Sequence, residues 1–190
     1  MRAFIAIELP QEIKDALARL QADLKKSEAD VKWVTPGNIH LTLKFLGEID
    51  ENTKLSVTGA LQEACRKILP FTLTLSSLGA FPKINFPRVI WIGVGAGDLE
   101  TKNLAKALEV ELIKIGIPRE DKAFSTHITI GRVRSAKNSR ILATQLQTLE
   151  DYLSGKTKEV KISKITFFKS TLTPSGPLYE ALQEIALATT

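Results

Sequence analysis

Apolar residues along the chain follow two spacings, one typical of strands and one typical of helices. Phe4–Leu9 and Trp91–Ala96 are short, mostly apolar runs that predict buried strands. Each run is followed by apolar residues at steps of three and four, which place them on one face of a helix. Those helix positions are Ile13, Leu17, Leu20 and Leu24 after the first run, and Leu104, Leu108, Leu112 and Ile115 after the second.

This strand–helix pattern is part of an internal repeat with an offset of 87 residues, which also carries His40 onto His127 and Thr42 onto Thr129. Each copy continues with a histidine-bearing strand, a helix, an extended stretch, a turn region that contains proline, and another strand. The ranges are Ile39–Leu46, Glu51–Lys67, Phe71–Leu78, Phe81–Pro87 and Val89–Val94 in the first copy, and Ser125–Val133, Lys137–Leu153, Glu159–Phe168, Thr173–Pro177 and Leu178–Gln183 in the second.

Two copies of this length are too few for a solenoid, and they predict instead two similar lobes related by a pseudo-twofold axis. The alternation of strands and helices predicts an α+β fold, with two antiparallel or mixed sheets and helices packed outside them. No linker rich in proline or serine separates the copies, and Gly95-Ala96-Gly97 is the softest boundary. We therefore expect residues 1–190 to form a single bilobal domain with a cleft between the lobes.

Composition adds little to this picture. Hydrophobic residues make up 44% of the chain and charged residues 25%, which is ordinary for a globular domain. The longest apolar stretch, Val89–Ala96, is too short to span a bilayer, and we find no pattern of a signal peptide. The single cysteine, Cys65, is expected to be a small core residue on a helix. A chain that cannot form an internal disulfide fits a cytoplasmic location.

The two histidines of the chain both occur in the pattern His-x-Thr-x, with apolar residues at both x positions. Residues two apart on a strand point to the same face, so each histidine shares a face with its threonine. A lone histidine on a strand is usually structural, but His40 with Thr42 and His127 with Thr129 occupy equivalent repeat positions. They predict four polar groups in one cleft. Without a nearby cysteine or suitably spaced carboxylates, two histidines fall short of a metal site.

These motifs resemble those of the two-histidine phosphoesterase superfamily, and within it the RNA 2′,3′-cyclic phosphodiesterases, also called 2′-5′ RNA ligases. The matching stretches extend over the chain: Met1–Ile7, Lys32–Val34, Asn38–Glu48 and Thr126–Arg132. The resemblance implies a bilobal α+β fold, no metal and no cofactor. It also implies hydrolysis of a 2′,3′-cyclic phosphate to a 2′-phosphate and, in some members, the joining of RNA ends through a 2′-5′ linkage in the reverse direction.

Opening a cyclic phosphate with water needs a base for the water proton and an acid for the leaving oxygen. Imidazole can serve as either near neutrality, because its unperturbed pKa is about 6.5. Following the resemblance, His40 is expected to be the proton donor and His127 the proton acceptor. Thr42 and Thr129 would hold the non-bridging phosphate oxygens through their hydroxyls.

The resemblance adds two substrate-binding positions, each five residues after a histidine. Arg132 would pair with phosphate and Phe45 would stack on a base. Strict strand alternation places both on the face opposite the histidines. A bulge at Gly131 would turn Arg132 back, whereas for Phe45 a core position is nearly as good an interpretation. Lys44 has the phase to face the cleft, but a solvated surface position fits it equally well.

A net charge of +5 is consistent with a polyanionic partner. One basic run could guide RNA, although such runs are usually only surface: Arg132, Arg134, Lys137 and Arg140. Trp33 and Trp91 are expected in the core. The predicted substrate is RNA that ends in a 2′,3′-cyclic phosphate, tRNA fragments included. The protein is expected to act as a monomer and not to associate with a membrane. Two alternatives stay open, namely a phosphodiesterase for a small cyclic nucleotide or ADP-ribose cyclic phosphate, and a non-catalytic RNA-binding module.

Overall fold

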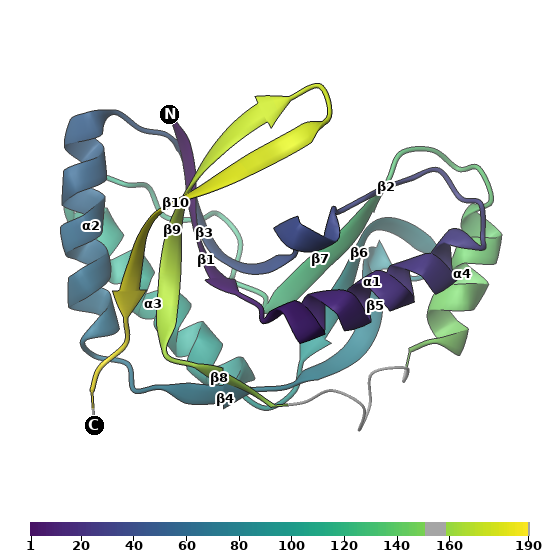
Figure 1. Cartoon of the computed structure of the whole chain (residues 1–190), viewed down its shortest axis with the longest axis horizontal. Helices are drawn as coiled ribbons and strands as arrows, with labels where there is room; N and C mark the ends of the chain where they lie inside the picture. Colours follow the sequence, from purple (N-terminus) through teal and green to yellow (C-terminus); the bar gives the residue numbers. More distant parts are fainter. Residues whose placement is uncertain (151–158, 190) are drawn as a thin grey trace.

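Two four-stranded antiparallel sheets flanked by helices make up the protein, as the computed structural model shows for residues 1–150 and 159–189 (Figure 1). Sheet A has the strand order β10-β9-β1-β3, sheet B has the order β2-β7-β6-β5, and a third, two-stranded sheet pairs β4 with β8. The expected α+β fold is therefore confirmed. The strands are β1 (Arg2–Glu8), β2 (Val31–Trp33), β3 (His40–Glu48), β4 (Phe71–Leu73), β5 (Leu75–Lys83), β6 (Phe86–Val94), β7 (His127–Val133), β8 (Val160–Ile162), β9 (Lys164–Thr173) and β10 (Gly176–Ala186). The helices are α1 (Gln11–Lys25), α2 (Glu51–Cys65), α3 (Asp98–Lys114), α4 (Ser139–Thr148) and the short 3-10 helix η1 (Pro36–Asn38).

Neither lobe is built from one continuous half of the chain. Sheet A combines β1 and β3 from the first copy of the repeat with β9 and β10 from the second. The helices cross over as well, because α3 from the second copy packs with α2 beside sheet A, and α1 from the first copy packs with α4 beside sheet B (Figure 1). The two copies of the repeat are therefore interleaved in both lobes.

The small sheet of β4 and β8 pairs equivalent strands of the two copies (bottom of Figure 1). Thr72 lies opposite Lys161, with Phe71 opposite Ile162 and Leu73 opposite Val160 on either side. This pairing is symmetric about its central residues, as a pseudo-twofold axis passing through the sheet requires.

The segment Gly95-Ala96-Gly97, the candidate boundary between the repeat copies, is packed against the rest of the molecule. Gly97 has a φ of +84° at the start of α3, and a Cβ there would lie 2.5 Å from the carbonyl oxygen of Thr72. The amide of Gly95 donates to the Thr74 carbonyl at 2.9 Å, and the Thr74 amide donates to the Ala96 carbonyl at 3.1 Å. These residues are part of the packed structure and do not behave as a linker between lobes.

A main core of buried apolar side chains runs through both lobes. It includes the predicted helix positions Ile13, Leu17, Leu20, Leu24, Leu104, Leu108 and Leu112, with Ile115 half-buried against it. Cys65 is fully buried at the end of α2, as expected, and burial raises the pKa of its thiol to about 12. No helix in the described part of the chain is long and apolar enough to cross a membrane.

Sequence and structure differ mainly at element boundaries. The overlapping strands predicted at Val89–Val94 and Trp91–Ala96 are one strand, β6, which closes the first copy and opens the second. The predicted turn region Phe81–Pro87 narrows to the two residues between β5 and β6. Helix α4 begins and ends inside the predicted Lys137–Leu153, and Leu153 itself lies outside the described residues.

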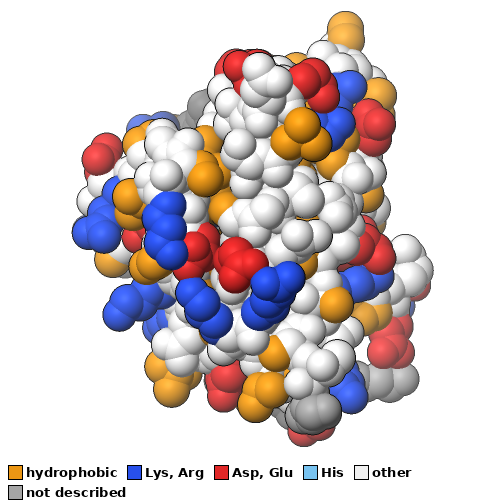
Figure 2. Space-filling model, turned by 90° about the vertical axis from the view of Figure 1, so that its left-hand side faces the viewer, with side chains coloured by type: hydrophobic (Ala, Val, Ile, Leu, Met, Phe, Trp, Pro, Cys, Tyr) orange, Lys and Arg blue, Asp and Glu red, His pale blue; other side chains and the backbone are white. Residues whose placement is uncertain are grey.

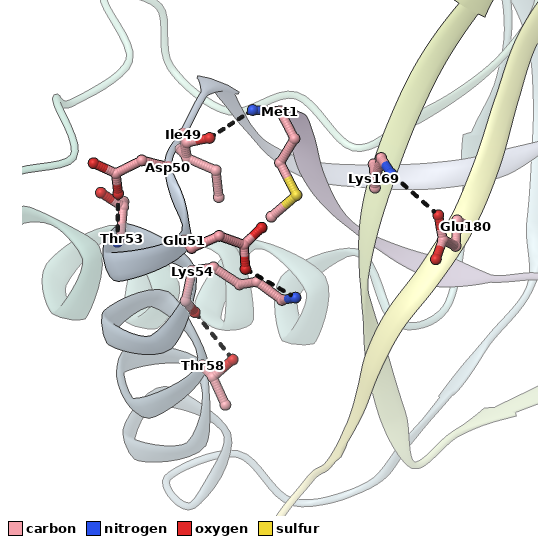
Figure 3. Close-up of polar contacts among 9 residues, drawn as sticks. All are labelled: Met1, Ile49, Asp50, Glu51, Thr53, Lys54, Thr58, Lys169 and Glu180. Atoms are coloured by element: carbon pink, nitrogen blue, oxygen red, sulfur yellow. Dashed lines mark hydrogen bonds and ion pairs between the residues drawn. The ribbon is translucent and has the colours of Figure 1, made fainter.

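Polar contacts anchor the far end of β3 to α2 and to the N-terminal amine (Figure 3). The carboxylate of Asp50 accepts a hydrogen bond from the Thr53 amide at 2.7 Å, which caps α2 and holds the pKa of that carboxyl below its usual range. The amine of Met1 donates to the Ile49 carbonyl at 2.6 Å. The strand that carries His40 is therefore fixed at the end away from the histidine.

Candidate active site

The two histidines begin the two strands that meet at the middle of the molecule. β3 of sheet A starts at His40 and β7 of sheet B starts at His127, and the two strands are in contact where the sheets meet (Figure 1). Both histidines line a single cleft of about 1070 Å³, together with Thr42 and Thr129. The structure thus brings together the four polar groups of the two His-x-Thr-x motifs.

A bulge in β3 changes which residues face this cleft. The pairing of β3 with β1 leaves Leu43 as an extra residue between Thr42 and Lys44. The bulge reverses the alternation, so that Phe45 shares the face of His40 and Thr42. Phe45 is 58% exposed and lines the cleft. Its placement by strict alternation, and the interpretation of Phe45 as a core residue, are therefore wrong.

An equivalent bulge lies in β7, where the pairing with β6 leaves Ile130 as the extra residue. It turns Arg132 into the cleft, at the repeat position that corresponds to Phe45. Gly131 is needed beside the bulge, because a Cβ there would lie 2.9 Å from Val31 and 3.0 Å from the ring of Trp33. The bulge next to this glycine is confirmed, and strict alternation is wrong for Arg132 as well.

A buried amide supports the bulge in β7. Gln21 on α1 is 1% exposed, and its Nε2 donates to the carbonyl oxygens of Ile130 and Val34, each at 2.8 Å. The carbonyl of the bulged residue also accepts a hydrogen bond from the Val34 amide at 3.0 Å, so Gln21 joins the bulge to the end of the neighbouring segment. Helix α1 of the first repeat copy thus stabilises the strand that carries the second histidine.

A buried charge supports the corresponding region of β3. Lys44 is 5% exposed, and its Nζ donates to the Pro118 carbonyl at 2.9 Å. The same Nζ lies 3.7 Å from a carboxylate oxygen of Glu109 and 3.6 Å from one of Glu120. These contacts hold the segment after α3 against β3. The interpretation of Lys44 as a solvated surface residue is wrong.

Backbone carbonyls fix the orientation of both imidazoles. His40 Nδ1 lies 2.7 Å from the Asn38 carbonyl oxygen, and His127 Nδ1 lies 2.7 Å from that of Ser125. A carbonyl oxygen only accepts hydrogen bonds, so Nδ1 of each ring carries a proton and Nε2 is left for chemistry. The hydroxyl oxygen of Thr42 lies 2.9 Å from His40 Nε2.

His40 lies among aromatic rings on the cleft face of sheet A. Its ring stacks on Phe4 with centroids 4.9 Å apart, and it meets Tyr179 edge to face at 5.4 Å. Phe168 in turn stacks on Phe4 at 5.1 Å. Burial lowers the pKa of His40 below its ordinary value, and the hydrogen bond to the Asn38 carbonyl opposes this effect only in part. The neutral imidazole is therefore favoured in the unliganded protein.

His127 has a different set of neighbours on the cleft face of sheet B. Its ring meets Phe81 edge to face at 5.2 Å, and Phe81 packs on Trp91 at 5.2 Å. Trp91 is half-buried on this face, next to Thr129 on the paired strand, and not in the main core where it was expected. Trp33, in contrast, packs against the main core, as expected.

The aromatic supports of the two histidines were not identified from the sequence, although the repeat contains a signal for most of them. The 87-residue shift lays Phe4 on Trp91 and Phe81 on Phe168. Each histidine therefore has two aromatic supports at equivalent positions. Tyr179, the third ring at His40, has no aromatic counterpart under this shift, so the repeat gives no signal for it.

Positive charge is concentrated on the cleft. The lining residues include seven cations and three carboxylates, an excess of four that accounts for most of the chain's net charge of +5. The cations are Arg2, Lys44, Lys102, Lys106, Arg119, Lys122 and Arg132, and the carboxylates are Glu109, Glu120 and Asp121. Burial raises the pKa of Tyr179, and the nearby charges of Arg132 and Arg2 oppose that rise. The cleft is thus suited to an anionic ligand.

Residues 1–150 and 159–189 contain no group of three or more His, Cys, Asp or Glu side chains that could hold a metal ion. The groups that the two motif strands present to the cleft include two imidazoles, the hydroxyls of Thr42 and Thr129, and the guanidinium of Arg132. That set can exchange protons and bind a phosphate group at the same point.

Comparison with known proteins identifies relatives over the whole chain. The family described as LigT like Phosphoesterase matches twice, at residues 7–91 and 95–179, in agreement with the internal repeat. The RNA 2′,3′-cyclic phosphodiesterase of Methanothermobacter thermautotrophicus is 32% identical over 187 residues, which cover 98% of this chain and 99% of the relative. The protein of the same name from Aquifex aeolicus is 36% identical over 192 residues, with coverage of 98% and 97%.

A solved structure agrees with the fold as well. LigT of E. coli, crystallised with 3′-AMP, superposes with a TM-score of 0.80 at 26% identity and covers 99% of this chain and 98% of its own. The likeness includes both lobes.

Proposed function

The chain belongs to the LigT-like phosphoesterase family, and we propose that it hydrolyses 2′,3′-cyclic phosphodiester ends of RNA to 2′-phosphomonoesters. One observation carries the proposal. Two imidazoles at equivalent repeat positions line one cleft, and each has its Nδ1 bonded to a backbone carbonyl and its Nε2 left for chemistry. Relatives named RNA 2′,3′-cyclic phosphodiesterase, similar over nearly their full length, support the choice of substrate.

In the proposed reaction, water attacks phosphorus while the bond from phosphorus to the 3′-oxygen breaks. His127 Nε2 accepts the proton that the water loses, and His40 Nε2 donates a proton to the departing 3′-oxygen. The product carries a 2′-phosphate and a free 3′-hydroxyl. Two imidazoles related by a pseudo-twofold axis suit an in-line displacement, because the attacking and leaving oxygens of such a reaction lie on opposite sides of phosphorus. The roles would reverse for synthesis of a 2′-5′ linkage.

His40 must be protonated to act as the acid, although its burial lowers its pKa in the unliganded protein. A bound phosphodiester brings a negative charge close to the ring, and a nearby opposite charge favours the protonated imidazole. We therefore propose that the substrate itself promotes protonation of His40. Carboxylate Glu8, paired with His40 across β1 and β3, acts in the same direction.

The hydroxyls of Thr42 and Thr129 are proposed to hold the non-bridging phosphate oxygens, with the guanidinium of Arg132 as their charged partner. In the unliganded protein the Thr42 hydroxyl is already within hydrogen-bonding distance of His40 Nε2. Phe45, exposed at the rim of the same cleft, is proposed to stack on the terminal base. Because one chain supplies both histidines, we propose that a monomer is active.

The proposal is tested by incubating the protein with an oligonucleotide that ends in a 2′,3′-cyclic phosphate and identifying the end group of the product. We expect a 2′-phosphate, formed at least about 10²-fold more slowly by His127→Ala. A 3′-phosphate, or an intact cyclic end, would overturn the proposal. A panel that includes 2′,3′-cyclic nucleotides and ADP-ribose cyclic phosphate separates RNA from the small-molecule alternatives, and EDTA is expected to leave the rate unchanged. Tight RNA binding without turnover would indicate the non-catalytic module.

A further inference from the structure

An RNA strand with a cyclic phosphate at its end must leave the cleft in one direction, because every other nucleotide lies on the 5′ side of the reacting group. Two walls extend from the histidines. One is the β9–β10 hairpin, and the other is α3 with the segment that joins it to β7. Since each internucleotide linkage carries a negative charge, the charges on the two walls decide which wall the strand follows.

The second of these walls is rich in cations. Four cationic side chains from α3 and the following segment line the cleft, and we call this set the α3 wall: Lys102, Lys106, Arg119 and Lys122. Lys106 and Lys122 are exposed, and neither makes a hydrogen bond or ion pair with any residue in 1–150 or 159–189. Both ammonium groups are therefore available to an anionic ligand.

Two of the three carboxylates on this side of the cleft are engaged by the buried Lys44. Glu109 and Glu120 lie within 3.7 Å and 3.6 Å of its Nζ, and Glu109 also accepts a hydrogen bond from the Glu120 amide at 3.0 Å. The same Nζ holds the backbone at Pro118. Lys44 thus offsets part of the negative charge behind the α3 wall, and its contacts fix the segment that carries Arg119 and Lys122.

The β9–β10 hairpin offers less to a phosphate backbone. The hairpin residues that line the cleft carry no charged side chain: Ser170, Leu172, Pro177 and Tyr179. Lys169 of the hairpin is paired with Glu180 across the two strands at 3.5 Å (Figure 3). Exposed Leu172 and Leu178 give the hairpin an apolar tip. The cations that act on Tyr179 of this wall are Arg132, already assigned to the reacting phosphate, and Arg2.

Among the described residues, two other groups of basic side chains lie largely outside the cleft. On the face of α2 and α3 that Figure 2 shows, basic and acidic side chains are intermixed, and Lys67 and Lys114 both pair with Glu111 at 2.6 Å. The basic run suggested by the sequence divides: Arg132 lines the cleft, whereas Arg140 lies on α4, at the outer end of sheet B (Figure 1).

We propose that the α3 wall binds the phosphodiester backbone of the RNA nucleotides on the 5′ side of the cyclic phosphate. The proposal rests on the proposed function for the identity of the strand. It separates two binding regions, because a mononucleoside 2′,3′-cyclic phosphate has no 5′ linkage to contact the wall. The wall should therefore contribute to the binding of oligonucleotides and leave the smallest substrate unaffected.

The test compares Lys106→Ala/Lys122→Ala with Lys137→Ala/Arg140→Ala, which removes the same charge outside the cleft. Each is assayed on a single-stranded oligonucleotide with a cyclic phosphate end and on a mononucleoside 2′,3′-cyclic phosphate, over a range of salt concentrations. For the wall variant we expect kcat/KM on the oligonucleotide to fall about tenfold, and its salt dependence to weaken by about 0.7 in log–log slope for each lysine removed. The control variant and the mononucleotide reaction should match the unaltered protein.

A second readout separates this proposal from the proposed function. Fluorescence anisotropy measures the affinity of each variant for an oligonucleotide that ends in a 2′-phosphate. Turnover of both substrates with equal constants in all variants would overturn the α3 wall and leave the proposed function intact. Absence of turnover in the unaltered protein, together with affinity that depends on Lys106 and Lys122, would overturn the proposed function and retain the wall. Equal losses in the two double variants would show a general charge effect and overturn the wall.

Discussion

The two sides of the cleft share a histidine motif, a bulge and a backbone carbonyl at Nδ1, yet their surroundings differ. His40 stacks on Phe4 beneath the edge of Tyr179, and burial lowers its pKa. His127 meets Phe81 at the edge of its ring. The repeat places the two imidazoles at equivalent positions in one cleft, which suits the proposed proton exchange on opposite sides of a phosphate. The neighbours are not fully equivalent, because Tyr179 at His40 has no aromatic counterpart under the 87-residue shift.

The supports of the two bulges differ in the same way. On the His127 side a neutral amide, Gln21, joins the carbonyl of the bulged Ile130 to that of Val34. On the His40 side the buried ammonium of Lys44 holds Pro118 and faces two carboxylates. Gln21 joins two backbone segments beside β7, whereas Lys44 also positions the segment that carries part of the α3 wall. Similar backbone geometry is thus stabilised by unrelated side chains.

Removal of either imidazole should produce the largest effect. His40→Ala and His127→Ala are each expected to lower kcat by about 10²–10⁴, the range typical of a lost proton transfer. The double variant should be little slower than either single one, because the two groups act as a unit. Steady-state kinetics measure the loss, and thermal unfolding checks that each variant folds. Near-normal turnover of one single variant would show that the chemistry uses a single histidine.

The equivalent positions 45 and 132 should give different kinetic signatures. Arg132→Ala removes a charged partner of the phosphate, so kcat/KM should fall about 10–100-fold, as for the loss of a hydrogen bond to a charged group. Phe45→Ala should mainly raise KM, because base stacking contributes about 1–3 kcal/mol to binding of substrate and transition state alike. Phe45→Tyr is the matched control and should keep the affinity. A fall in kcat for Phe45→Ala without a change in KM would contradict its assignment to base stacking.

The helices, the strands and the histidine pair could be predicted from the sequence, because they depend on local patterns and on the repeat. Apolar spacing identified α1 and α3, and the shared phase of His40 with Thr42 placed both on one face of β3. Strict alternation gave the wrong face for Phe45, because a bulge is a property of the pairing between strands and cannot be read from one strand alone. Only the partner strand shows that Leu43 is unpaired.

The side chains that support the site could not be predicted for a similar reason. Gln21 and Lys44 gain their roles from partners far along the chain, at Ile130 and Pro118. In the sequence each is a polar residue beside apolar ones, with nothing to identify its partner. The α3 wall was not predicted because its cations come from a helix and a loop and are not adjacent in the sequence. The basic run from Arg132 to Arg140 is easily seen in the sequence, but of its four basic residues Arg132 is the one that lines the cleft.

Loss of the Gln21 amide should be a smaller effect, confined to the His127 side. Gln21→Met keeps the length of the side chain but removes the donor to the carbonyls of Ile130 and Val34. We expect the free energy of unfolding to fall by about 0.5–1.5 kcal/mol, the net contribution of a typical hydrogen bond, because the Ile130 carbonyl keeps its hydrogen bond from the Val34 amide. Denaturant titration measures this change, with Gln62→Met on the exposed face of α2 as the control. Equal stability of the two variants would show that the bulge does not depend on Gln21.

The smallest expected effect concerns the protonation of His40 and the ring that covers it. Burial holds the pKa of His40 below its ordinary value, so exposing the ring to water should raise that pKa. The pH profile of kcat/KM should be bell-shaped, with one limb set by His40 in the unliganded protein. Tyr179→Ala removes the ring that meets His40 edge to face, and it should move that limb to higher pH. Tyr179→Phe keeps the ring without the hydroxyl, and its profile should stay where it is. A limb that moves equally in both variants would assign the effect to the hydroxyl of Tyr179, and a limb that moves in neither would show that burial by this ring does not set the pKa of His40.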